Sequence, residues 1–184
     1  MSESEIELIK RLNDPPKREA AFSILVSECQ ERIYWHIRKM VLVHEDADDV
    51  MQNTFLKAWK GLDTFRGESL FVTWLYRIAS NETMTFLNNK KSKWMVSFSS
   101  AEDTIMHQLE ADKYFNANEV QLKFQKSLLT LPSKQRLVFN MKYFDELTYE
   151  QISEIVGTSV GALKASYHHA VKKIEKYFEE NEGF

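Results

Sequence analysis

Residues 148–170 read TYEQISEIVGTSVGALKASYHHA, and this stretch decides much of the fold. A short amphipathic run with Ile152 and Ile155 on one side ends at Gly157, a residue that can take the left-handed conformation that closes a helix. Ser159 follows two residues later, in the position of a helix N-cap. A short helix, a glycine turn and a capped second helix make the layout of a helix-turn-helix.

The second helix of this motif separates an apolar side from a small and basic side. Leu163, Tyr167 and Ala170 recur at the spacing of a core-facing stripe. The opposite side carries small residues, which let a helix approach base edges, and lysines, which contact phosphates. This side is predicted to face DNA: Gly161, Lys164, Ala165 and His168. The alternative is a helical hairpin with a solvated basic face.

Apolar residues spaced three and four apart predict helices on both sides of a central segment. We expect helices over residues 22–40, 47–58, 71–91, 119–129, 134–144, 148–156 and 160–178. Ser69 is the expected N-cap of the third. Between residues 94 and 118 the periodicity weakens and serines cluster, which is typical of a linker. We predict an all-α protein with two small helical domains, residues 1–93 and 119–184, joined by a flexible linker at 94–118.

Turn-forming residues are scarce in this chain. Its 184 residues include five glycines and three prolines, about 4% of the chain where ordinary usage is roughly 12%. Such a composition favours long helices and excludes an all-β sandwich or barrel. The hydrophobic fraction of 43%, with 4 Trp, 7 Tyr and 12 Phe, is enough for a core and excludes disorder throughout.

The net charge of -3 conceals an alternation along the chain. Residues 45–49 contain four carboxylates, and residues 101–119 carry five carboxylates against one lysine. Residues 77–93 and 157–176 each carry four cationic side chains against one carboxylate. Two basic segments are thus separated by acidic ones. Overall acidity argues against a surface that binds nucleic acid everywhere, but not against local DNA contacts.

No segment predicts export or membrane insertion. Cys29 is the only cysteine, so an internal disulfide is excluded, and residues 1–10 lack the basic start and apolar run of a signal peptide. No stretch approaches the roughly 18 apolar residues of a membrane span. We expect a soluble, cytoplasmic protein in a reducing compartment, with no direct membrane insertion, no cofactor and no metal.

Two blocks of this sequence resemble one known family. Residues 134–170, KQRLVFNMKYFDELTYEQISEIVGTSVGALKASYHHA, resemble region 4 of sigma-70 family transcription initiation factors of the extracytoplasmic-function (ECF) group. Residues 46–81, DADDVMQNTFLKAWKGLDTFRGESLFVTWLYRIASN, resemble region 2 of the same group. The resemblance implies a non-enzymatic bacterial subunit that binds core RNA polymerase and directs it to promoters. In the family, region 2 reads and opens the -10 element, and region 4 reads the -35 element.

The resemblance also implies which residues make each contact. The helix with the carboxylate run docks on the clamp coiled coil of the largest polymerase subunit, through Asp48, Asp49, Gln52 and Phe55. The loop at 64–69 captures a base flipped from the melted non-template strand, and the -10 contacts are Phe65, Arg66, Gly67, Ser69, Arg77, Asn81, Lys90 and Lys91. The contacts to the double-stranded -35 element are Ser159, Gly161, Lys164, Ala165, Ser166, His168, His169 and Lys172.

Four positions differ from the usual pattern of the group. Thr85 and Asn88 stand where an Asp and an Arg are usual, and Ser166 and His169 stand where Arg is common. Fewer fixed charges imply weaker phosphate contact and a different promoter sequence. Because family members are often inhibited by an anti-sigma protein that covers both domains, we also expect such a partner.

Two other functions are compatible with parts of the sequence. A stand-alone helix-turn-helix regulator would bind an operator as a dimer, but it leaves the block at 46–81 unexplained. An enzyme could use the carboxylates at 45–49 as a metal site, although no Glu-x-x-His or second acidic motif supports it. Taken alone, these carboxylates are also typical of a solvated helix start, where the helix dipole favours negative charge.

Overall fold

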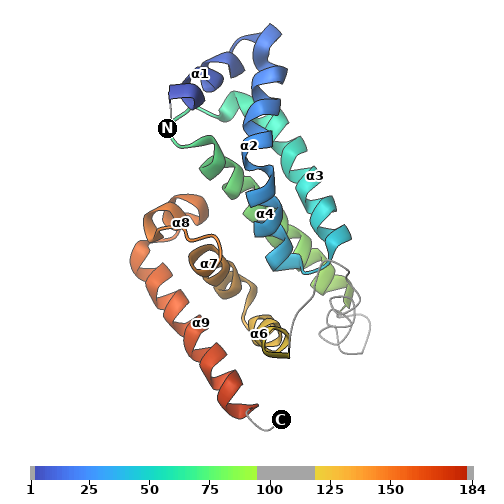
Figure 1. Ribbon diagram of the computed structural model, residues 1–184, viewed down its shortest axis with the longest axis vertical. Coiled ribbons are helices and arrows are strands. Elements are labelled where there is room, and N and C mark those ends of the chain that lie inside the picture. Colours follow the sequence, from blue (N-terminus) through green and yellow to red (C-terminus); the bar gives the residue numbers. More distant parts are fainter. Residues whose placement is uncertain (1–2, 95–118, 182–184) are drawn as a thin grey trace.

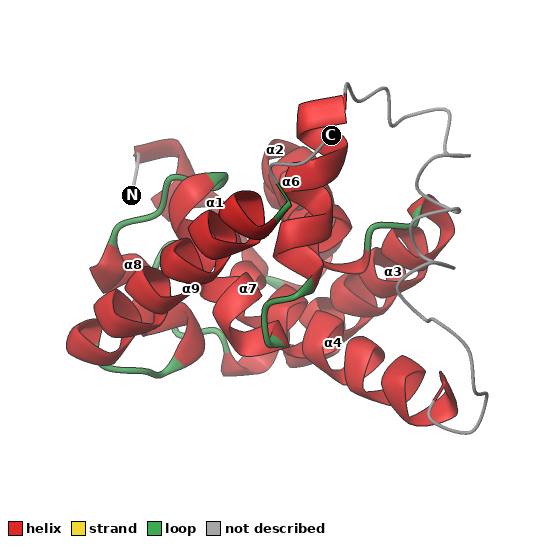
Figure 2. Cartoon of the chain, turned by 90° about the horizontal axis from the view of Figure 1, so that it is seen from below, coloured by secondary structure: helices red, strands yellow, loops and turns green. Residues whose placement is uncertain are grey.

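The computed structural model describes residues 3–94 and 119–181, with side chains at 5–90 and 119–181. All regular structure in these ranges is helical (Figures 1 and 2), which confirms the all-α prediction. The elements are α1 (Glu3–Leu12), α2 (Pro15–Val41), α3 (His44–Gly61), the 3-10 turn η1 (Leu62–Thr64), α4 (Phe71–Trp94), α6 (Glu119–Leu129), α7 (Ser133–Tyr143), α8 (Tyr149–Val156) and α9 (Val160–Glu180). Beyond residue 94, the expected linker lies outside the described residues. No helix in the described part is both long and apolar enough to span a bilayer.

Helices α1 to α4 form the first group, in which α2, α3 and α4 lie side by side and α1 packs on α2 (Figure 1). Their common core includes side chains that are at most 1% exposed: Ile33, Ile37, Met40 and Leu75. Each such side chain contributes about 1.5–3 kcal/mol by leaving water. The apolar stripes predicted from the sequence therefore form the core of this group.

Both ends of α2 are determined by local backbone chemistry. Pro15 and Pro16 occupy its first positions, where the missing N–H groups leave no helical hydrogen bond unmade. At the other end Leu42 has a φ of 68°, and its N–H donates to the Arg38 carbonyl at 2.8 Å. This left-handed residue lets the chain turn at once into α3.

Helix α1 has no counterpart among the predicted helices. Leu8 and Leu12, four residues apart, are buried and could have indicated it. The helix also supplies a long-range cap, because the Glu5 carboxylate accepts the N–H of Phe71 at the start of α4, at 3.0 Å. This contact takes the place expected for Ser69, whose hydroxyl lies 3.4 Å from the Leu70 carbonyl that it donates to.

Helices α8 and α9 form the predicted helix-turn-helix. Thr148 and Gln151 make a reciprocal capping box: the Thr148 hydroxyl accepts the Gln151 N–H at 3.2 Å, and the Gln151 side chain accepts the Thr148 N–H at 2.8 Å. Gly157 ends α8 with a φ of 67°. Ser159 then caps α9 by accepting the N–H of Ala162 at 3.4 Å. Gly157 and Ser159 thus act as predicted from the sequence, and the structure adds the capping box of Thr148 and Gln151.

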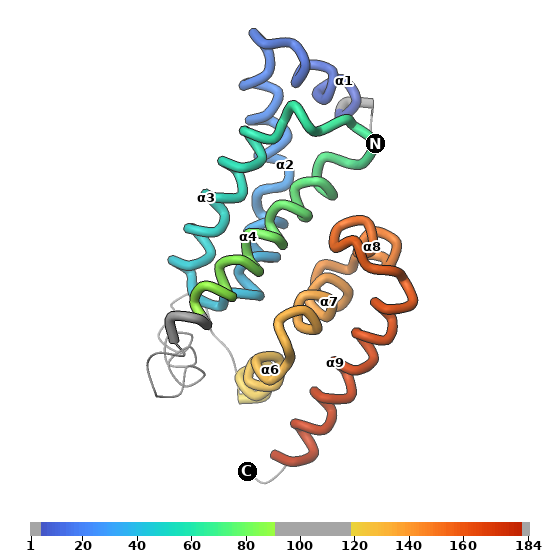
Figure 3. Tube along the Cα trace, turned by 180° about the vertical axis from the view of Figure 1, so that it is seen from behind, coloured from blue at the N-terminus to red at the C-terminus, as the bar shows by residue number. Residues whose placement is uncertain are grey.

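The two groups of helices pack against each other, α7 on α2 and α8 on α4 (Figure 3). Asp145 lies in this contact with its side chain 3% exposed. Its carboxylate accepts hydrogen bonds from His36 Nδ1 at 2.7 Å and Lys39 Nζ at 2.9 Å. Burial alone would raise the pKa of Asp145, but the hydrogen bond from His36 and the charge of Lys39 outweigh it and hold the pKa below its ordinary range. The second half is thus attached through an ionised, buried carboxylate.

Side chains of α7 also cap the C-terminal end of α2. Arg136 Nη2 donates to the Met40 carbonyl at 3.2 Å, and Asn140 Nδ2 donates to the Lys39 carbonyl at 3.3 Å. Carbonyls in the last turn of a helix have no partner within that helix, so these donors satisfy groups that would otherwise need water. The relative position of the two groups therefore rests on polar contacts as well as apolar packing.

The left-handed turn at Gly157 yields a stability prediction. An added Cβ there would meet nothing within 4 Å, so Gly157→Ala tests the backbone conformation alone. We expect a loss of about 1 kcal/mol in the free energy of unfolding, because L-residues disfavour this region. Gly161→Ala is the matched control: it also has open space, but it lies in α9 without a positive φ. Urea unfolding should show little change or a small gain for the control, and equal losses in both variants would contradict the explanation.

Candidate functional site

One exposed face of α9 contains most of the residues expected to contact the -35 element. At 100° per residue, five of them fall within an arc of about 100°. All five are exposed: Gly161, Lys164, Ala165, His168 and Lys172. The buried residues of the helix lie on its opposite side: Leu163, Ala170 and Ile174. The helix therefore packs on one side and presents a small, basic side to solvent.

Three further residues of the -35 prediction lie off this face. Ser166 is half-buried and about 140° around the helix from Gly161. His169 is exposed, about 80° from Gly161. The Ser159 hydroxyl is engaged as the N-cap, accepting the Ala162 N–H. Ser159 thus supports the start of the helix, and DNA contacts by these three residues stay predictions.

The loop between α3 and α4 borders a cavity of about 510 Å³. Arg66 and Glu68 are exposed on either side of Gly67, whose φ of 70° turns the chain sharply. Phe65 is only 9% exposed and packs its ring on Trp74, with 5.0 Å between the centroids. Phe65 therefore supports the loop from the core side in this conformation. The cavity is lined by Thr64, Phe65, Arg66, Glu68, Ser69, Trp74, Arg77 and Glu154.

Helix α8 reaches the same cavity through Glu154. Arg77 Nη2, from α4, donates to the Glu154 carbonyl at 2.6 Å. This carbonyl lies in the last turn of α8, where carbonyls have no helical partner and a cation is favoured by the helix dipole. A residue expected to contact the -10 strand is thus engaged by the other half of the chain.

The remaining -10 candidates on α4 do not form one surface. Asn81 is exposed one turn after Arg77, on the same side of the helix. Lys90 is about 220° around α4 from Arg77 and pairs with Asp46 of α3. Lys91 belongs to α4, but its side chain lies outside the described ones. The structure brings Arg77 and Asn81 together near the loop and directs Lys90 toward α3.

The carboxylate run occupies the start of α3, where the helix dipole favours negative charge. Asp48 and Asp49 are exposed, and Asp48 Oδ2 lies 3.4 Å from His44 Nε2. Gln52 is exposed one turn further along the helix. The three polar residues predicted to bind polymerase therefore lie on the outer surface of α3.

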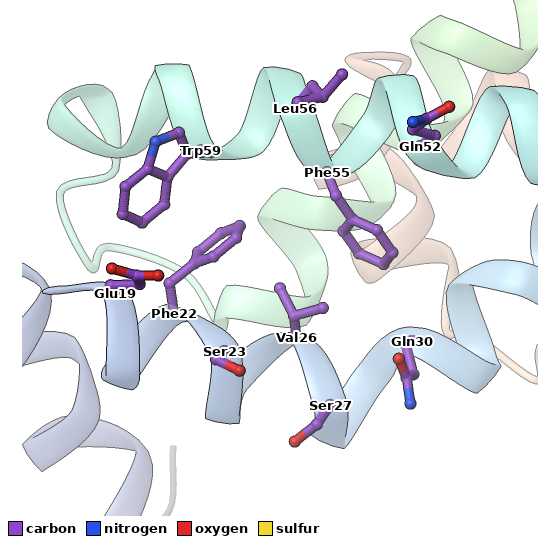
Figure 4. A pocket seen from close by; sticks show the side chains of 10 residues that line it. All are labelled: Glu19, Phe22, Ser23, Val26, Ser27, Gln30, Gln52, Phe55, Leu56 and Trp59. Atoms are coloured by element: carbon purple, nitrogen blue, oxygen red, sulfur yellow. The ribbon is translucent and has the colours of Figure 1, made fainter.

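An apolar groove of about 700 Å³ continues from these residues between α2 and α3 (Figure 4). Phe55 is half-buried in it, whereas Leu56 and Trp59 are 51% and 41% exposed. The Trp59 ring meets the Phe22 ring edge-on, with 5.2 Å between centroids. The lining residues are Glu19, Phe22, Ser23, Val26, Ser27, Gln30, Gln52, Phe55, Leu56 and Trp59.

The sequence prediction includes Gln52 and Phe55 but misses the neighbouring Leu56 and Trp59. A signal was available, because these four residues recur at i, i+3, i+4 and i+7, which marks a second stripe on α3 beside the buried one. What the pattern does not reveal is that α2 contributes the other wall of the groove. Only the packing of the two helices creates the concave surface.

No group of three or more metal-ligating side chains gathers anywhere in the described part of the chain. Among the carboxylates at 45–49, Asp46 contacts Lys90 and Asp48 lies close to His44. These contacts are typical of ion pairs on a helical surface. The metal-enzyme interpretation of this run therefore finds no supporting geometry.

Both halves of the chain match known family models. Residues 25–93 match sigma-70 region 2, and residues 121–174 match sigma-70, region 4. The chain is 30% identical to the ECF RNA polymerase sigma factor SigW of Bacillus subtilis, over 94% of this chain and 97% of the relative. It is also 30% identical to the RNA polymerase sigma-H factor of Pseudomonas aeruginosa, over 95% of this chain and 93% of that protein.

Solved structures share the fold over most of the chain. CnrH, in complex with the cytosolic domain of CnrY, matches with a TM-score of 0.69 and 19% identity, over 97% of this chain and 99% of CnrH. RpoE of Bartonella quintana, in complex with the anti-sigma factor NepR, matches with a TM-score of 0.65 and 20% identity, over 87% of this chain and 98% of RpoE. By the two matching regions and the full-length relatives, the chain belongs to the sigma-70 family of RNA polymerase sigma factors, in its extracytoplasmic-function group.

Proposed function

We propose that this sigma factor divides promoter recognition between the two parts of its chain. Like its family, it is a promoter-specific transcription initiation factor and not an enzyme. Residues 1–93 bind core RNA polymerase and the -10 element, and residues 119–184 bind the -35 element. The observation that supports this division best is the exposed small and basic face of α9, which follows a capped glycine turn.

In the proposed -35 contact, the start of α9 enters the major groove. The groove is about 12 Å wide and a helix with its side chains is about 10–12 Å across, so small residues are needed at the closest approach. Gly161 and Ala165 meet this need, and Lys164 and Lys172 are placed on the same face to contact bases or phosphates.

In the proposed -10 contact, a base flipped from the non-template strand enters the cavity beside the loop at 64–69. Extruding a base costs a few kcal/mol, which contacts in the pocket must offset. Stacking on an aromatic ring contributes about 1–3 kcal/mol per base, and the half-buried Trp74 lines the cavity. Arg66 and Arg77 add positive charge at the cavity, where the backbone of a melted strand would pass.

In the proposed polymerase contact, α3 offers both charge and apolar surface. Asp48, Asp49 and Gln52 provide polar complementarity for a partner. The adjoining groove around Phe55 and Trp59 can receive the apolar face of a partner helix. This combination suits a helical element of core polymerase that carries basic residues beside an apolar stripe.

The partners of the solved relatives extend the proposal to regulation. CnrH was solved with the cytosolic domain of CnrY, and RpoE with the anti-sigma factor NepR. We propose that this chain likewise has an anti-sigma partner. We place the chain in the cytoplasm, where core polymerase and promoter DNA are found.

A reconstituted transcription assay tests the proposed function. Core polymerase with this chain should start transcripts at defined promoters that core polymerase alone ignores, and sequencing their 5′ ends will give the -10 and -35 preferences. Failure to bind core polymerase would refute the proposal. Tight sequence-specific binding to duplex DNA without polymerase would support the stand-alone regulator instead.

Reversing one charge on the α9 face should weaken -35 recognition. We expect Lys164→Glu to reduce initiation at least fivefold at promoters that depend on the -35 element, since one such contact contributes about 1–3 kcal/mol. Lys126→Glu, an equal charge change at an exposed position of α6, should have little effect. Equal initiation by both variants would count against this orientation of α9. Run-off transcription on matched templates provides the measurement.

Reversing a charge on α3 should weaken polymerase binding without affecting the fold. Asp49 is exposed, so we expect Asp49→Arg to leave helix content unchanged and to raise the Kd for core polymerase at least tenfold, about 1.4 kcal/mol. Glu179→Arg on α9 is the control. A titration monitored by fluorescence anisotropy gives both constants, and indistinguishable values would exclude Asp49 from the interface.

A further inference from the structure

Tyr149, the first residue of α8, lies beside two lysines from the helices that adjoin α8 in the chain. Lys142 Nζ of α7 is 5.3 Å from the centroid of the Tyr149 ring, and Lys164 Nζ of α9 is 5.8 Å from it. Both ammonium groups lie within about 6 Å of the centroid, a distance at which the electron-rich face of an aromatic ring attracts a cation. One ring of α8 thus attracts a cation from α7 and another from α9.

Other aromatic rings hold the Tyr149 ring in place. The Tyr149 side chain is half-buried and packs against the main core. Its ring meets the Tyr167 ring edge-on, with 6.4 Å between the centroids, and Tyr167 in turn stacks on Phe139 at 5.5 Å. Aromatic pairs of this geometry are favourable beyond the area that they bury. The Tyr149 ring is therefore a rigid support for the two lysines.

The two lysines differ in how firmly they are held. Lys142 is half-buried, and its ammonium also donates to the Leu147 carbonyl at 3.1 Å. Lys164 is exposed, so its flexible stem would otherwise sample many rotamers. The attraction of the Tyr149 ring favours the rotamers that direct the Lys164 ammonium toward α8. Favouring one conformation before binding lowers the entropic cost of the contact that uses it.

The direction of the Lys164 ammonium indicates which part of the duplex it meets. When a helix-turn-helix binds DNA, its second helix lies in the major groove and its first helix crosses the backbone. Lys164 belongs to the second helix, α9, but its ammonium is directed toward the first, α8. Lys142 adds a second positive charge beside the same ring. Two cations beside the helix that crosses the backbone suit a phosphate, which fixes the register of the protein and carries no sequence information.

We infer that Tyr149 is a positioning residue, which holds Lys164 beside α8 so that the ammonium contacts a phosphate of the -35 duplex and does not read a base. The inference rests on the proposed function, because it assigns a role to one residue of the proposed -35 contact. Reading of base edges then belongs to the rest of the exposed α9 face, which includes Gly161, Ala165 and His168. Tyr149 acts through Lys164 and needs no contact of its own with DNA.

Promoter binding by core polymerase loaded with this chain, measured at several salt concentrations, tests the phosphate assignment. The templates are a promoter identified by 5′-end sequencing and versions of it with single base-pair changes in the -35 element. Lys164→Met keeps most of the stem and removes the charge. We expect it to weaken binding to every template by a similar factor, about threefold or more, and to lower the slope of log K against log salt by about one. An unchanged slope, or a loss of discrimination at a single base pair, would overturn the assignment.

The role of Tyr149 is tested on the same templates. Tyr149→Phe keeps the ring and should bind as the wild type does, whereas Tyr149→Leu should weaken binding to every template about threefold, as expected for one exposed cation–π contact. Lys164→Met should then cost less in the Tyr149→Leu background than in the wild type, because the two residues act together. Equal costs in both backgrounds would overturn the positioning.

Tyr177→Leu is the matched control. It removes another half-buried tyrosine ring, 13 residues or about 20 Å further along α9 from Lys164, and should change neither the affinity nor the salt slope.

Fluorinated phenylalanines at position 149 separate positioning from packing. Fluorine withdraws charge from the ring face and leaves the shape nearly unchanged, so promoter affinity should fall with each added fluorine while the urea midpoint stays constant. A flat series would overturn the positioning, even if Tyr149→Leu fails to fold. A wild-type chain that does not bind core polymerase refutes the proposed function, whereas normal promoter binding with a flat series refutes the role of Tyr149 alone.

Discussion

The burial of one carboxylate, Asp145, determines how the two halves of this protein are arranged. An ionised group taken out of water is tolerated only when opposite charge and hydrogen bonds replace its hydration. His36 and Lys39 supply both from α2, which holds the turn after α7 against the first group of helices. Because α8 follows that turn directly, the same contact places α8 against α4.

Exchange of helix caps strengthens this arrangement. Arg136 and Asn140 of α7 satisfy carbonyls at the end of α2, and Arg77 of α4 satisfies one at the end of α8. Each half thus completes a helix terminus of the other, in a contact that water could replace. Apolar packing accompanies these caps, because Leu137 and Ile152 of the second half belong to one continuous core with Ile33 and Leu75 of the first.

The distribution of charge explains how an acidic protein serves as a DNA-binding subunit. The carboxylates at the start of α3 are stabilised by its dipole, and in the proposed function they bind a protein partner while the basic face of α9 binds DNA. Because that face carries few lysines and phosphate neutralisation supplies most of the affinity for DNA, we expect weak duplex binding by the isolated chain. In the proposed function, attachment to polymerase raises the effective concentration at the promoter of both proposed DNA contacts, the α9 face and the loop at 64–69.

The sequence by itself determined the described helices other than α1, the helix-turn-helix and the exposed face of α9, because these depend on hydrogen bonds and periodicity within a few residues, as at Gly157 and Ser159. It did not reveal that Phe65 is buried, nor that Phe22 and Trp59 meet across a groove. It gave no sign of the contact between His36 and Asp145, which are 109 residues apart. Tertiary structure alone decided these features, because a partner's position in space cannot be read from spacing along one helix.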